Sequence, residues 1–564
     1  MKARALIGTT LVALSSMATL VPAAEMARGV VFEDLNADGT FQESEPGVAG
    51  VAVSNGKEVV GTDADGRYRI VVEPGDTLFL TKPSGWAVPL SSEELPRFYY
   101  HFVPDGVPAG RRPRYQGIAP SGPLPESIDF ALTRRPEPTR FTSIWFADPQ
   151  PQTRDEVEFI RDDAVAELIG AEAAFGITLG DITYDDLSLY PRLSRNIAQI
   201  GVPWYHVPGN HDVNKLAAND DEALDTFRRN FGPPYYSFDY GQVHFVVLDT
   251  VMYEGTSLGT DDPDPLGSGP YKGGIGGRQL AWIANDLRRV PMDRLVVLAM
   301  HIPLHSETDP EEPKVNVADR AQLLEVLEGR EHLLAVAGHM HIAEHYYFDS
   351  DSGFDGAVPL HLHTLSAVCG SWWSGPLDER GVPTSLQRDG APRGYYLMEI
   401  DGAEATLRFQ ATGKPADCQM RITLDPGFPR QSVDIRRDYR HGELLGNRLE
   451  MSQLYSTRVL VNLFEGGPLS VVEFQIADGR AIKMHRVVRI DPFVEELFQR
   501  ESDTVKSWVE AEPTTHIWEA PLPDGLQPGA HTITVRATDE YGRVHTAHKV
   551  FEISGMAPFE APVD

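Results

Sequence analysis

The chain has 564 residues, of which 50 are basic and 82 acidic, so its formal net charge is −32 at pH 7. At roughly 150 residues per domain, this length predicts three or four domains. The acidic balance disfavours nucleic acid and anionic membranes as partners, because like charges repel. The two cysteines, Cys369 and Cys418, are too few for a disulfide scaffold, and the sequence leaves open whether they are bonded.

The chain begins with a pattern typical of a secretory signal peptide. Residues 1–4 carry positive charge, residues 5–21 are apolar or small, and Ala23 and Ala24 form a small-residue cleavage site. Residues 1–24 are therefore predicted to be removed on export, which would give a periplasmic or secreted protein. We expect no membrane span, because no later segment is long and apolar enough.

Residues 25–135 are predicted to form an N-terminal all-β sandwich with a loop of the calcium-binding type. Alternate oxygen-bearing side chains project inward, Gly39 permits a sharp bend, and a Glu stands at the twelfth position. The flanking strands exclude an EF-hand helix pair, and the module resembles the calcium-binding β-sandwich modules of bacterial surface proteins. The alternative is a surface turn without an ion. The candidate Ca²⁺ ligands are Asp34, Asn36, Asp38, Thr40 and Glu45.

Residues 136–410 alternate apolar strand-like runs with helical periodicity, which predicts an α/β module. The strands expected to lead into polar loops are Phe141–Ala147, Ala174–Leu179, Val202–Val207, Leu295–Met300 and Leu333–Ala337. The expected helices are Val157–Ile169, Leu187–Ile200, Ala223–Asn230, Gln279–Val290 and Ala321–Leu327. Because ligands bind outside the carboxyl ends of strands in open α/β sheets, the five polar loops are predicted to form one site.

These loops carry an ordered set of short motifs. They are Asp-x-Gln from residue 148, Gly-Asp-x-x-x-Asp from residue 180, Gly-Asn-His-Asp from residue 209, the isolated His301, and Gly-His-x-His from residue 338. The set resembles that of the calcineurin-like metallophosphoesterases over about residues 140–410. The resemblance implies an α/β four-layer sandwich, with helices flanking two β-sheets, and a binuclear centre of Mn, Fe or Zn. It places Asp148, Gln150 and His341 on one metal, Asp181 as the bridge, Asn210, His301 and His339 on the other, and His211 as proton donor.

The chemistry of these side chains agrees with that placement. Two divalent cations close together repel, so a shared carboxylate such as Asp181 suits a bridge, while amide and imidazole fill other positions. A bridging water becomes hydroxide near neutral pH and attacks phosphorus, while His211 protonates the leaving oxygen. Asp212 is expected to accept the other N–H of His211 and to set its tautomer.

One ligand position departs from the commonest pattern. The usual first motif is Asp-x-His, whereas Gln150 offers an amide oxygen, which is a weaker donor. Tyr184 is the alternative ligand, because its spacing from Asp181 is similar to that of the tyrosinate in purple acid phosphatases. We favour the plain Asp-x-Gln arrangement, in which Tyr184 lies at the mouth of the site.

Two further groups are candidates for substrate binding. Trp372 and Trp373 lie in a Gly-rich loop after the predicted strand His361–Val368, and His305 follows the strand that precedes His301. The Trp pair is suited to an apolar wall for a substrate, or alternatively to a domain contact. Cys369 is not expected to be a nucleophile, because no activating His is identifiable.

Residues 411–564 lose the helical period and are predicted to form a C-terminal β-sandwich domain. The whole chain is thus expected to be an exported, binuclear metal-dependent phosphoesterase that hydrolyses a small phosphate monoester or diester. The alternative is a calcium-stabilised surface binding protein with a degenerate site at Gln150, and a nuclease is disfavoured by the charge. Oligomeric state cannot be inferred from the sequence.

Overall fold

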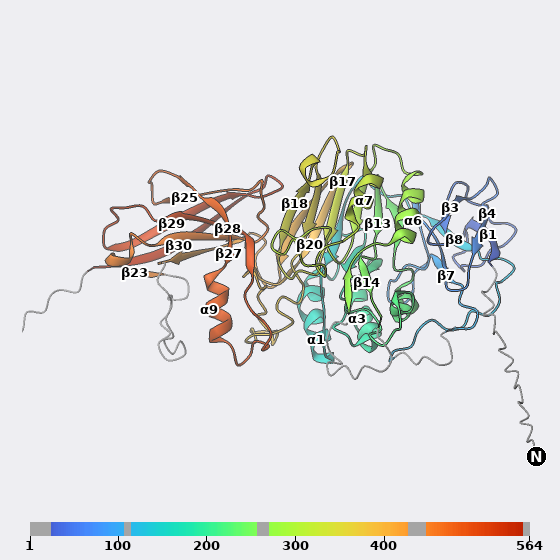
Figure 1. Cartoon of the computed structure of the whole chain (residues 1–564), viewed down its shortest axis with the longest axis horizontal. Helices are drawn as coiled ribbons and strands as arrows, with labels where there is room; N and C mark the ends of the chain where they lie inside the picture. Colours follow the sequence, from blue (N-terminus) through green and yellow to red (C-terminus); the bar gives the residue numbers. More distant parts are fainter. Residues whose placement is uncertain (1–23, 107–113, 256–269, 427–446, 556–564) are drawn as a thin grey trace, which may run out of the picture.

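The computed structural model describes residues 24–106, 114–255, 270–426 and 447–555. Residues 1–23 of the predicted signal peptide lie outside this range. The described parts form an elongated molecule in which an N-terminal β module, a central α/β body and a C-terminal β region lie in a row (Figure 1). In the part of the chain that the structure describes, no helix is both long and apolar enough to cross a bilayer.

The N-terminal module consists of two four-stranded sheets, in the orders β4-β1-β8-β6 and β3-β2-β5-β7. Exposed and buried residues alternate along β4, since one face of the strand packs against the core. The strands are β1 Glu25–Glu33, β2 Ala52–Ser54, β3 Val59–Gly61, β4 Arg67–Val72, β5 Thr77–Leu80, β6 Trp86–Ala87, β7 Tyr99–His101 and β8 Phe130–Arg134.

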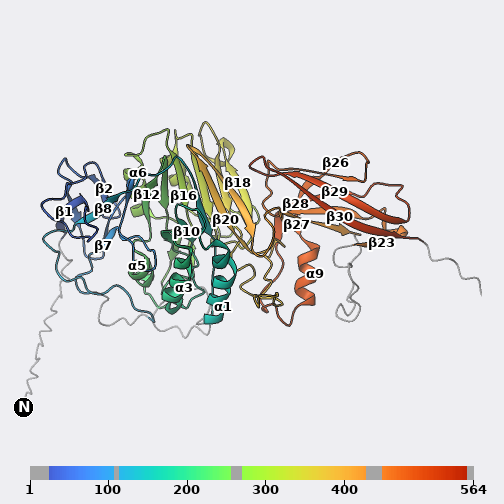
Figure 2. The same ribbon diagram turned by 180° about the vertical axis from the view of Figure 1, so that it is seen from behind.

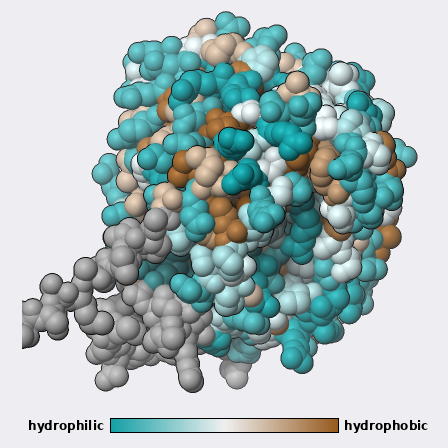
Figure 3. Space-filling model, turned by 90° about the vertical axis from the view of Figure 1, so that its right-hand side faces the viewer, coloured by the Kyte–Doolittle hydropathy of each residue, from teal (hydrophilic) through white to brown (hydrophobic). Residues whose placement is uncertain are grey.

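This module packs directly on the central body. The ring of Phe79 meets that of Trp282 edge-on, with centroids 6.0 Å apart, and Lys82 forms a buried ion pair with Glu137 at 2.7 Å. Glu137 lies in the Pro-containing segment 134–140, which connects this module to the central body. The ion pair therefore fixes the connecting segment to the N-terminal module. Figure 3 shows this end of the molecule, where hydrophilic residues predominate and hydrophobic ones are scattered.

Two sheets of mixed direction form the central body, in the orders β11-β10-β9-β20-β21 and β12-β13-β16-β17-β19-β18. Strands β9, β10 and β11 are mutually parallel, as are β13, β16, β17 and β19, and antiparallel strands border each group. The strands of these two sheets are β9 Arg140–Phe146, β10 Gly176–Leu179, β11 Trp204–Val207, β12 Tyr236–Tyr240, β13 Val243–Val247, β16 Leu295–Ala299, β17 Leu333–Ala337, β18 Glu344–Phe348, β19 Leu360–Thr364, β20 Gly394–Asp401 and β21 Glu404–Ala411. Strands β14 Val251–Tyr253 and β15 Tyr271–Gly273 pair as a separate two-stranded sheet. The predicted α/β sandwich is confirmed.

Helices lie beside both central sheets, with α1 and α3 near β10 and with α6 near β12 (Figures 1 and 2). The first helix begins at Arg154, before its predicted start, because the Thr153 side chain caps it by accepting from the backbone N–H of Glu156. The helical elements are α1 Arg154–Ile160, the π-helix η1 Arg161–Val165, α2 Ala166–Leu168, η2 Leu187–Leu189, α3 Tyr190–Ile197, η3 Ala198–Ile200, α4 Asp220–Ala223, α5 Asp225–Phe231, α6 Gly277–Leu287, α7 Arg320–Leu327 and η4 Ser350–Ser352.

The C-terminal region consists of two sheets, in the orders β22-β24-β28-β27 and β23-β30-β29-β25-β26, around a separate hydrophobic core. Its elements are β22 Met420–Asp425, β23 Arg448–Glu450, η5 Met451–Gln453, β24 Arg458–Leu463, β25 Val471–Ile476, β26 Ile482–Lys483, β27 His485–Ile490, α9 Pro492–Arg500, β28 Pro513–Pro521, β29 Gly529–Thr538 and β30 Val544–Ser554. The two-sheet arrangement agrees with the predicted sheet-rich C-terminal part.

Candidate metal centre

The polar loops meet at the carboxyl ends of β9, β10, β11, β16 and β17. Glycines permit this close approach: a Cβ added to Gly209 would lie 2.2 Å from the backbone nitrogen of Asp181, and one on Gly338 would lie 2.7 Å from Asp148 Oδ2. Left-handed backbone conformations of non-glycine residues are also concentrated here. They occur at Asp148, Gln150, Asp181, Asp185, His339, His341, Trp372 and Trp373. Such a concentration is typical of a functional site.

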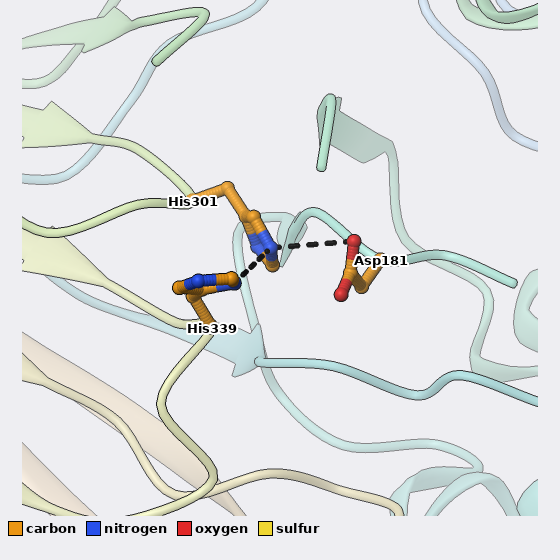
Figure 4. A group of neighbouring side chains, drawn as sticks. All are labelled: Asp181, His301 and His339. Carbon is orange, nitrogen blue, oxygen red and sulfur yellow. Dashed lines mark hydrogen bonds and ion pairs between the residues drawn. The ribbon is translucent and has the colours of Figure 1, made fainter. Parts of the chain in front are cut away.

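Asp181, His301 and His339 converge, and their ligand-type atoms lie within 4.8 Å of one another (Figure 4). His301 Nε2 lies 3.2 Å from Asp181 Oδ1, 3.0 Å from Asn210 Oδ1 and 3.1 Å from His339 Nδ1. The other ring nitrogen, Nδ1, donates to the carbonyl of Leu179 at 2.7 Å. This bond fixes the tautomer in which Nε2 is available to a metal.

Asp148 and His341 lie beside this group, with Asp148 Oδ1 4.0 Å from His301 Nδ1. Asp148 Oδ2 accepts the backbone N–H of His339 at 2.9 Å, while the fully buried Oδ1 has no hydrogen-bond partner. His341 Nε2 lies 3.7 Å from Asp148 Oδ1, and its Nδ1 donates to the carbonyl of Gly370 at 2.9 Å. A buried carboxylate oxygen without a partner is costly, so this position fits a cation.

The charges of the ligand set suit a cationic guest. Burial raises the pKa of Asp148 to about 7, with the like charge of Asp181 adding to the effect. Burial also opposes ionisation of Asp181, but His301 and His211 hold its pKa below the usual range. Burial lowers the pKa of His341 to about 3 and that of His339 well below its ordinary value. Neutral imidazole is the form that binds metals, so His339 and His341 are ready to ligate. Burial disfavours the charged form of His301, but Asp181 and Asp148 outweigh it and raise the pKa of His301 to about 9. Metal binding at His301 Nε2 would therefore release a proton.

His211 points to a different carboxylate from the one expected. Its Nδ1 bonds Asp185 Oδ1 at 2.8 Å, and Lys215 Nζ pairs with the other oxygen of Asp185 at 2.5 Å. Asp212 instead accepts from the backbone N–H groups of Gly209 and Ile182 and from the Tyr190 hydroxyl. The predicted His211–Asp212 contact is therefore wrong, because Asp212 is fully used in holding the loop.

Asp185 is the functional residue that the sequence reasoning missed. The signal was present, since Asp185 is the last residue of the Gly-Asp-x-x-x-Asp motif. Burial disfavours the charged form of His211, but Asp181 and Asp185 outweigh it and raise the pKa of its imidazole. A raised pKa favours the protonated ring that a proton donor requires.

Gln150 and Tyr184 occupy different positions around the centre. The buried amide of Gln150 donates to Asp181 through Nε2, and Cys369 Sγ lies 4.0 Å from Gln150 Oε1. The ring of Tyr184 stacks on that of His211, with centroids 4.3 Å apart. Tyr184 therefore packs against His211, the expected proton donor, whereas Gln150 contacts Asp181, the expected bridging carboxylate.

A pocket of about 240 Å³ opens over the centre. Trp372 lines it and stacks on His341 at 4.4 Å between centroids. Trp373 is wrongly predicted as a substrate residue, because it is buried and its Nε1 donates to the Pro149 carbonyl at 2.8 Å. His305 packs its ring on Tyr346 at 4.4 Å between centroids and is not among the residues that line this pocket, so its substrate role stays a prediction.

The pocket is also lined by residues that lie outside the sequence motifs. Tyr271, Arg388 and Glu512 line it, and Glu512 comes from the C-terminal region. Arg388 forms an ion pair with Glu512 and lies over the ring of Trp372 at 5.9 Å. These contacts join residues far apart in the sequence, so a linear pattern could not reveal them.

The two cysteines do not form a disulfide with each other. Cys369 and Cys418 are both unpaired, and burial raises the pKa of the Cys369 thiol well above its ordinary value. Such a thiol is a poor nucleophile.

In the calcium-type loop, Asp34 and Glu45 are buried, and Asp34 Oδ1 has no hydrogen-bond partner. Asn36, Asp38 and Thr40 are exposed.

Comparisons with known proteins place these observations in a wider context. One relative is a probable glycerophosphodiester phosphodiesterase GpdQ of Arcobacter nitrofigilis, 24% identical over 191 residues, or 34% of this chain and 64% of the relative. The match thus spans less than two thirds of that relative. The solved structure of purple acid phosphatase PPD1 from yellow lupin (Lupinus luteus) seeds is 13% identical, with a TM-score of 0.33, and the match covers 69% of this chain and 67% of that one.

Family models account for three successive parts of the chain. Residues 35–111 match the model described as N terminal of Calcineurin-like phosphoesterase, and residues 144–343 match that of Calcineurin-like phosphoesterase. Residues 363–545 match the model described as C terminal of Calcineurin-like phosphoesterase. The strand-end site lies within the middle match. The chain therefore belongs to the calcineurin-like phosphoesterase family, with both the N-terminal and the C-terminal extensions.

Proposed function

We propose that the protein is an exported, metal-dependent phosphoesterase that hydrolyses a small phosphate monoester or diester. This proposal rests on the convergence of Asp181, His301 and His339. His211, the candidate proton donor, lies beside them and donates its backbone N–H to Asp181. The pocket of about 240 Å³ fits a small substrate rather than a polymer. The net charge of −32 also disfavours nucleic acid as the substrate.

The residues fit a binuclear centre in the grouping expected from the family. Asp148 and His341 would hold one metal, and Gln150 would join them once its amide turns to present Oε1 instead of Nε2. Asp181 would bridge, and Asn210, His301 and His339 would hold the other metal. The partnerless Asp148 Oδ1 supports this assignment. Two divalent cations bound there would activate water and neutralise negative charge on the phosphoryl group. The donor set suits Mn, Fe or Zn.

The chain's own residues supply the remaining chemistry. His211, held by Asp185, keeps a proton at Nε2 and delivers it to the leaving oxygen of the ester. The backbone N–H of His211 donates to Asp181 Oδ1 at 2.8 Å. This bond fixes the position of the proton donor relative to the bridging carboxylate. Trp372 and Arg388 border the space for the rest of the substrate.

Hydrolysis of two chromogenic esters tests this function. Purified protein supplied with Mn²⁺, Fe²⁺ or Zn²⁺ is expected to cleave p-nitrophenyl phosphate, bis-p-nitrophenyl phosphate or both, and the preferred compound assigns the ester class. His211→Ala should lower kcat by about 10²- to 10⁴-fold, the usual contribution of a proton donor. Absence of hydrolysis with every metal would favour the alternative, a surface binding protein with a degenerate centre.

We also propose that the loop from Asp34 to Glu45 binds Ca²⁺ for rigidity. The partnerless Asp34 Oδ1 and the burial of both carboxylates support this role. The oxygens of Glu45 accept the backbone N–H groups of Leu35 and Gln42 at 3.0 and 2.9 Å, so ion binding would exchange those bonds for ligation. Addition of Ca²⁺ should raise the thermal midpoint of the wild type but not that of Asp34→Asn.

The export part of the proposal rests on the sequence of residues 1–24. The cationic start, the apolar run and the small-residue site together favour cleavage and a periplasmic or secreted location. Fractionation of producing cells, with N-terminal sequencing of the mature chain, checks it. A mature protein that retains Met1 in the cytoplasm would contradict it.

A further inference from the structure

A second group of metal-type side chains lies at the junction between the central sheet and the C-terminal region. His345 on β18 stands opposite His363 on β19, and Glu465 follows β24. Their ligand-type atoms lie within 4.8 Å of one another, and their exposed fractions are 0%, 1% and 9%. The group shares no residue with the centre around Asp181.

Neighbouring side chains orient both rings through Nδ1. His345 Nδ1 lies 2.9 Å from His361 Nε2, and His363 Nδ1 lies 2.9 Å from the Tyr541 hydroxyl. His363 Nε2 is 2.8 Å from Glu465 Oε2. Partners at Nδ1 that turn Nε2 toward the ion are typical of metal-binding histidines. An ion would replace the bond between His363 Nε2 and Glu465 by ligation to both.

The buried Nε2 of His345 has no hydrogen-bond partner. The main-chain carbonyl of Glu465 also lies near this ring, but no hydrogen bond of normal geometry reaches Nε2. A fully buried nitrogen without a partner requires an explanation, and an ion at this position provides one.

Electrostatics at the junction also favours a cation. Burial lowers the pKa of His363 to about 3 and that of His345 well below its ordinary value, so both rings are neutral and able to ligate. Glu465 Oε1 accepts from the Tyr396 hydroxyl at 2.6 Å, so the carboxylate is held with Oε2 toward His363.

We propose that His345, His363 and Glu465 bind a further metal ion of the zinc class, separate from the catalytic centre. Two imidazoles and one carboxylate are a common zinc ligand set, with a fourth position left to water. The ion would join the central sheet to the C-terminal region, because each side supplies ligands. A groove whose wall includes His345, Pro468 and Leu469 gives the ion a route from solvent.

Zinc stoichiometry of the full chain tests this site. Protein stripped with a chelator is dialysed against Zn²⁺, and bound zinc is counted by elemental analysis. The wild type should bind one zinc more than His345→Gln or Glu465→Gln. His516→Gln is the matched control, since His516 is buried at the same junction but bonds Asn462 and Asp389, and it should bind as much zinc as the wild type.

Two further measurements keep the outcome clear. Asp181→Asn should lose zinc from the catalytic centre and retain the junction ion, so failure of the proposed function and failure of this site are distinguishable. Anomalous scattering at the zinc edge from wild-type crystals should give a peak between His345, His363 and Glu465 even if the variants do not fold. Equal zinc content in the wild type and His345→Gln, or no such peak, would overturn the proposal and leave a hydrogen-bonded cluster.

Discussion

At the scale of single residues, the centre depends on side chains whose orientation is fixed by a second set of contacts. Leu179 and Gly370 hold His301 and His341 through their carbonyl groups, and Asp185 holds His211. Such outer contacts determine which ring nitrogen faces a metal or a substrate. Their loss should therefore affect function more than stability.

Asp185→Asn removes the carboxylate that supports the imidazolium of His211. We expect kcat to fall by about 10- to 100-fold, as for other supporting contacts. Because Asp185 raises the pKa of His211, the alkaline limb of the kcat–pH profile should also move to lower pH. Asp186→Asn is the control, since the Asp186 side chain caps η2 through Ser188 and also interacts with Tyr115. An unchanged profile for Asp185→Asn would show that Asp185 does not act on the donor.

Gly209→Ala places a methyl group 2.2 Å from the backbone nitrogen of Asp181 and 2.3 Å from its Oδ1. The collision should displace the bridging carboxylate, lower bound transition metal and destabilise the fold by about 1 to 3 kcal/mol. Metal analysis and denaturant unfolding measure both effects. Gly277→Ala, where the added Cβ meets nothing within 4 Å, should leave both quantities unchanged. Normal metal content in Gly209→Ala would count against the geometry of the bridge.

At the scale of elements, buried polar pairs join the helices to the sheets. His244 on β13 bonds Asp286 on α6 at 2.9 Å and Asp239 on β12 at 2.8 Å. Burial disfavours the charged ring, but the two carboxylates outweigh it and raise the pKa of His244 to about 9. The imidazolium therefore fastens α6 to the six-stranded sheet.

This cluster predicts a pH-dependent stability. Because the folded pKa of His244 lies above its unfolded value of about 6.5, the stabilisation is complete below that pH and is lost as pH rises through about 9. The free energy of unfolding, measured in denaturant from pH 6 to pH 10, should fall over this window. His244→Gln should show a flatter profile. A wild-type slope equal to that of the variant would contradict this assignment.

At the scale of the whole molecule, the catalytic pocket needs the C-terminal region. Glu512 and Pro513 contribute to its wall, and Glu512 pairs with Arg388 above Trp372. Further contacts cross the same junction, such as the ion pair of Arg486 with Glu307 at 2.9 Å. The pocket and the domain junction therefore share residues.

Arg388→Ala should raise KM by about tenfold and change kcat little, because it removes a cationic wall of the pocket and leaves the metal ligands in place. Arg486→Ala provides the control, as it breaks a junction ion pair outside the pocket. Steady-state kinetics on the preferred ester distinguish the two. Equal KM values for Arg388→Ala and the wild type would exclude a substrate contact.

The sequence predicted the central fold and the convergence of the ligands well, because apolar strands followed by Asp148, Asp181, His301 or His339 are local signals. It placed the His211 partner wrongly, since loop geometry decides between two nearby carboxylates. The substrate role of Trp373 failed because neighbouring Trp residues can face opposite environments. The junction group of His345, His363 and Glu465 had no linear signal, since strand pairing and domain packing create it.

The metal content of the purified wild type, compared with that of Asp181→Asn by elemental analysis, tests the central claim most directly. Asp181 lies between both ligand groups, so a binuclear centre predicts at least two transition-metal ions per wild-type chain and a clear loss in the variant, together with loss of ester hydrolysis. Equal transition-metal content in the two proteins, or calcium as the sole metal of the wild type, would contradict a metal-dependent phosphoesterase centred on Asp181.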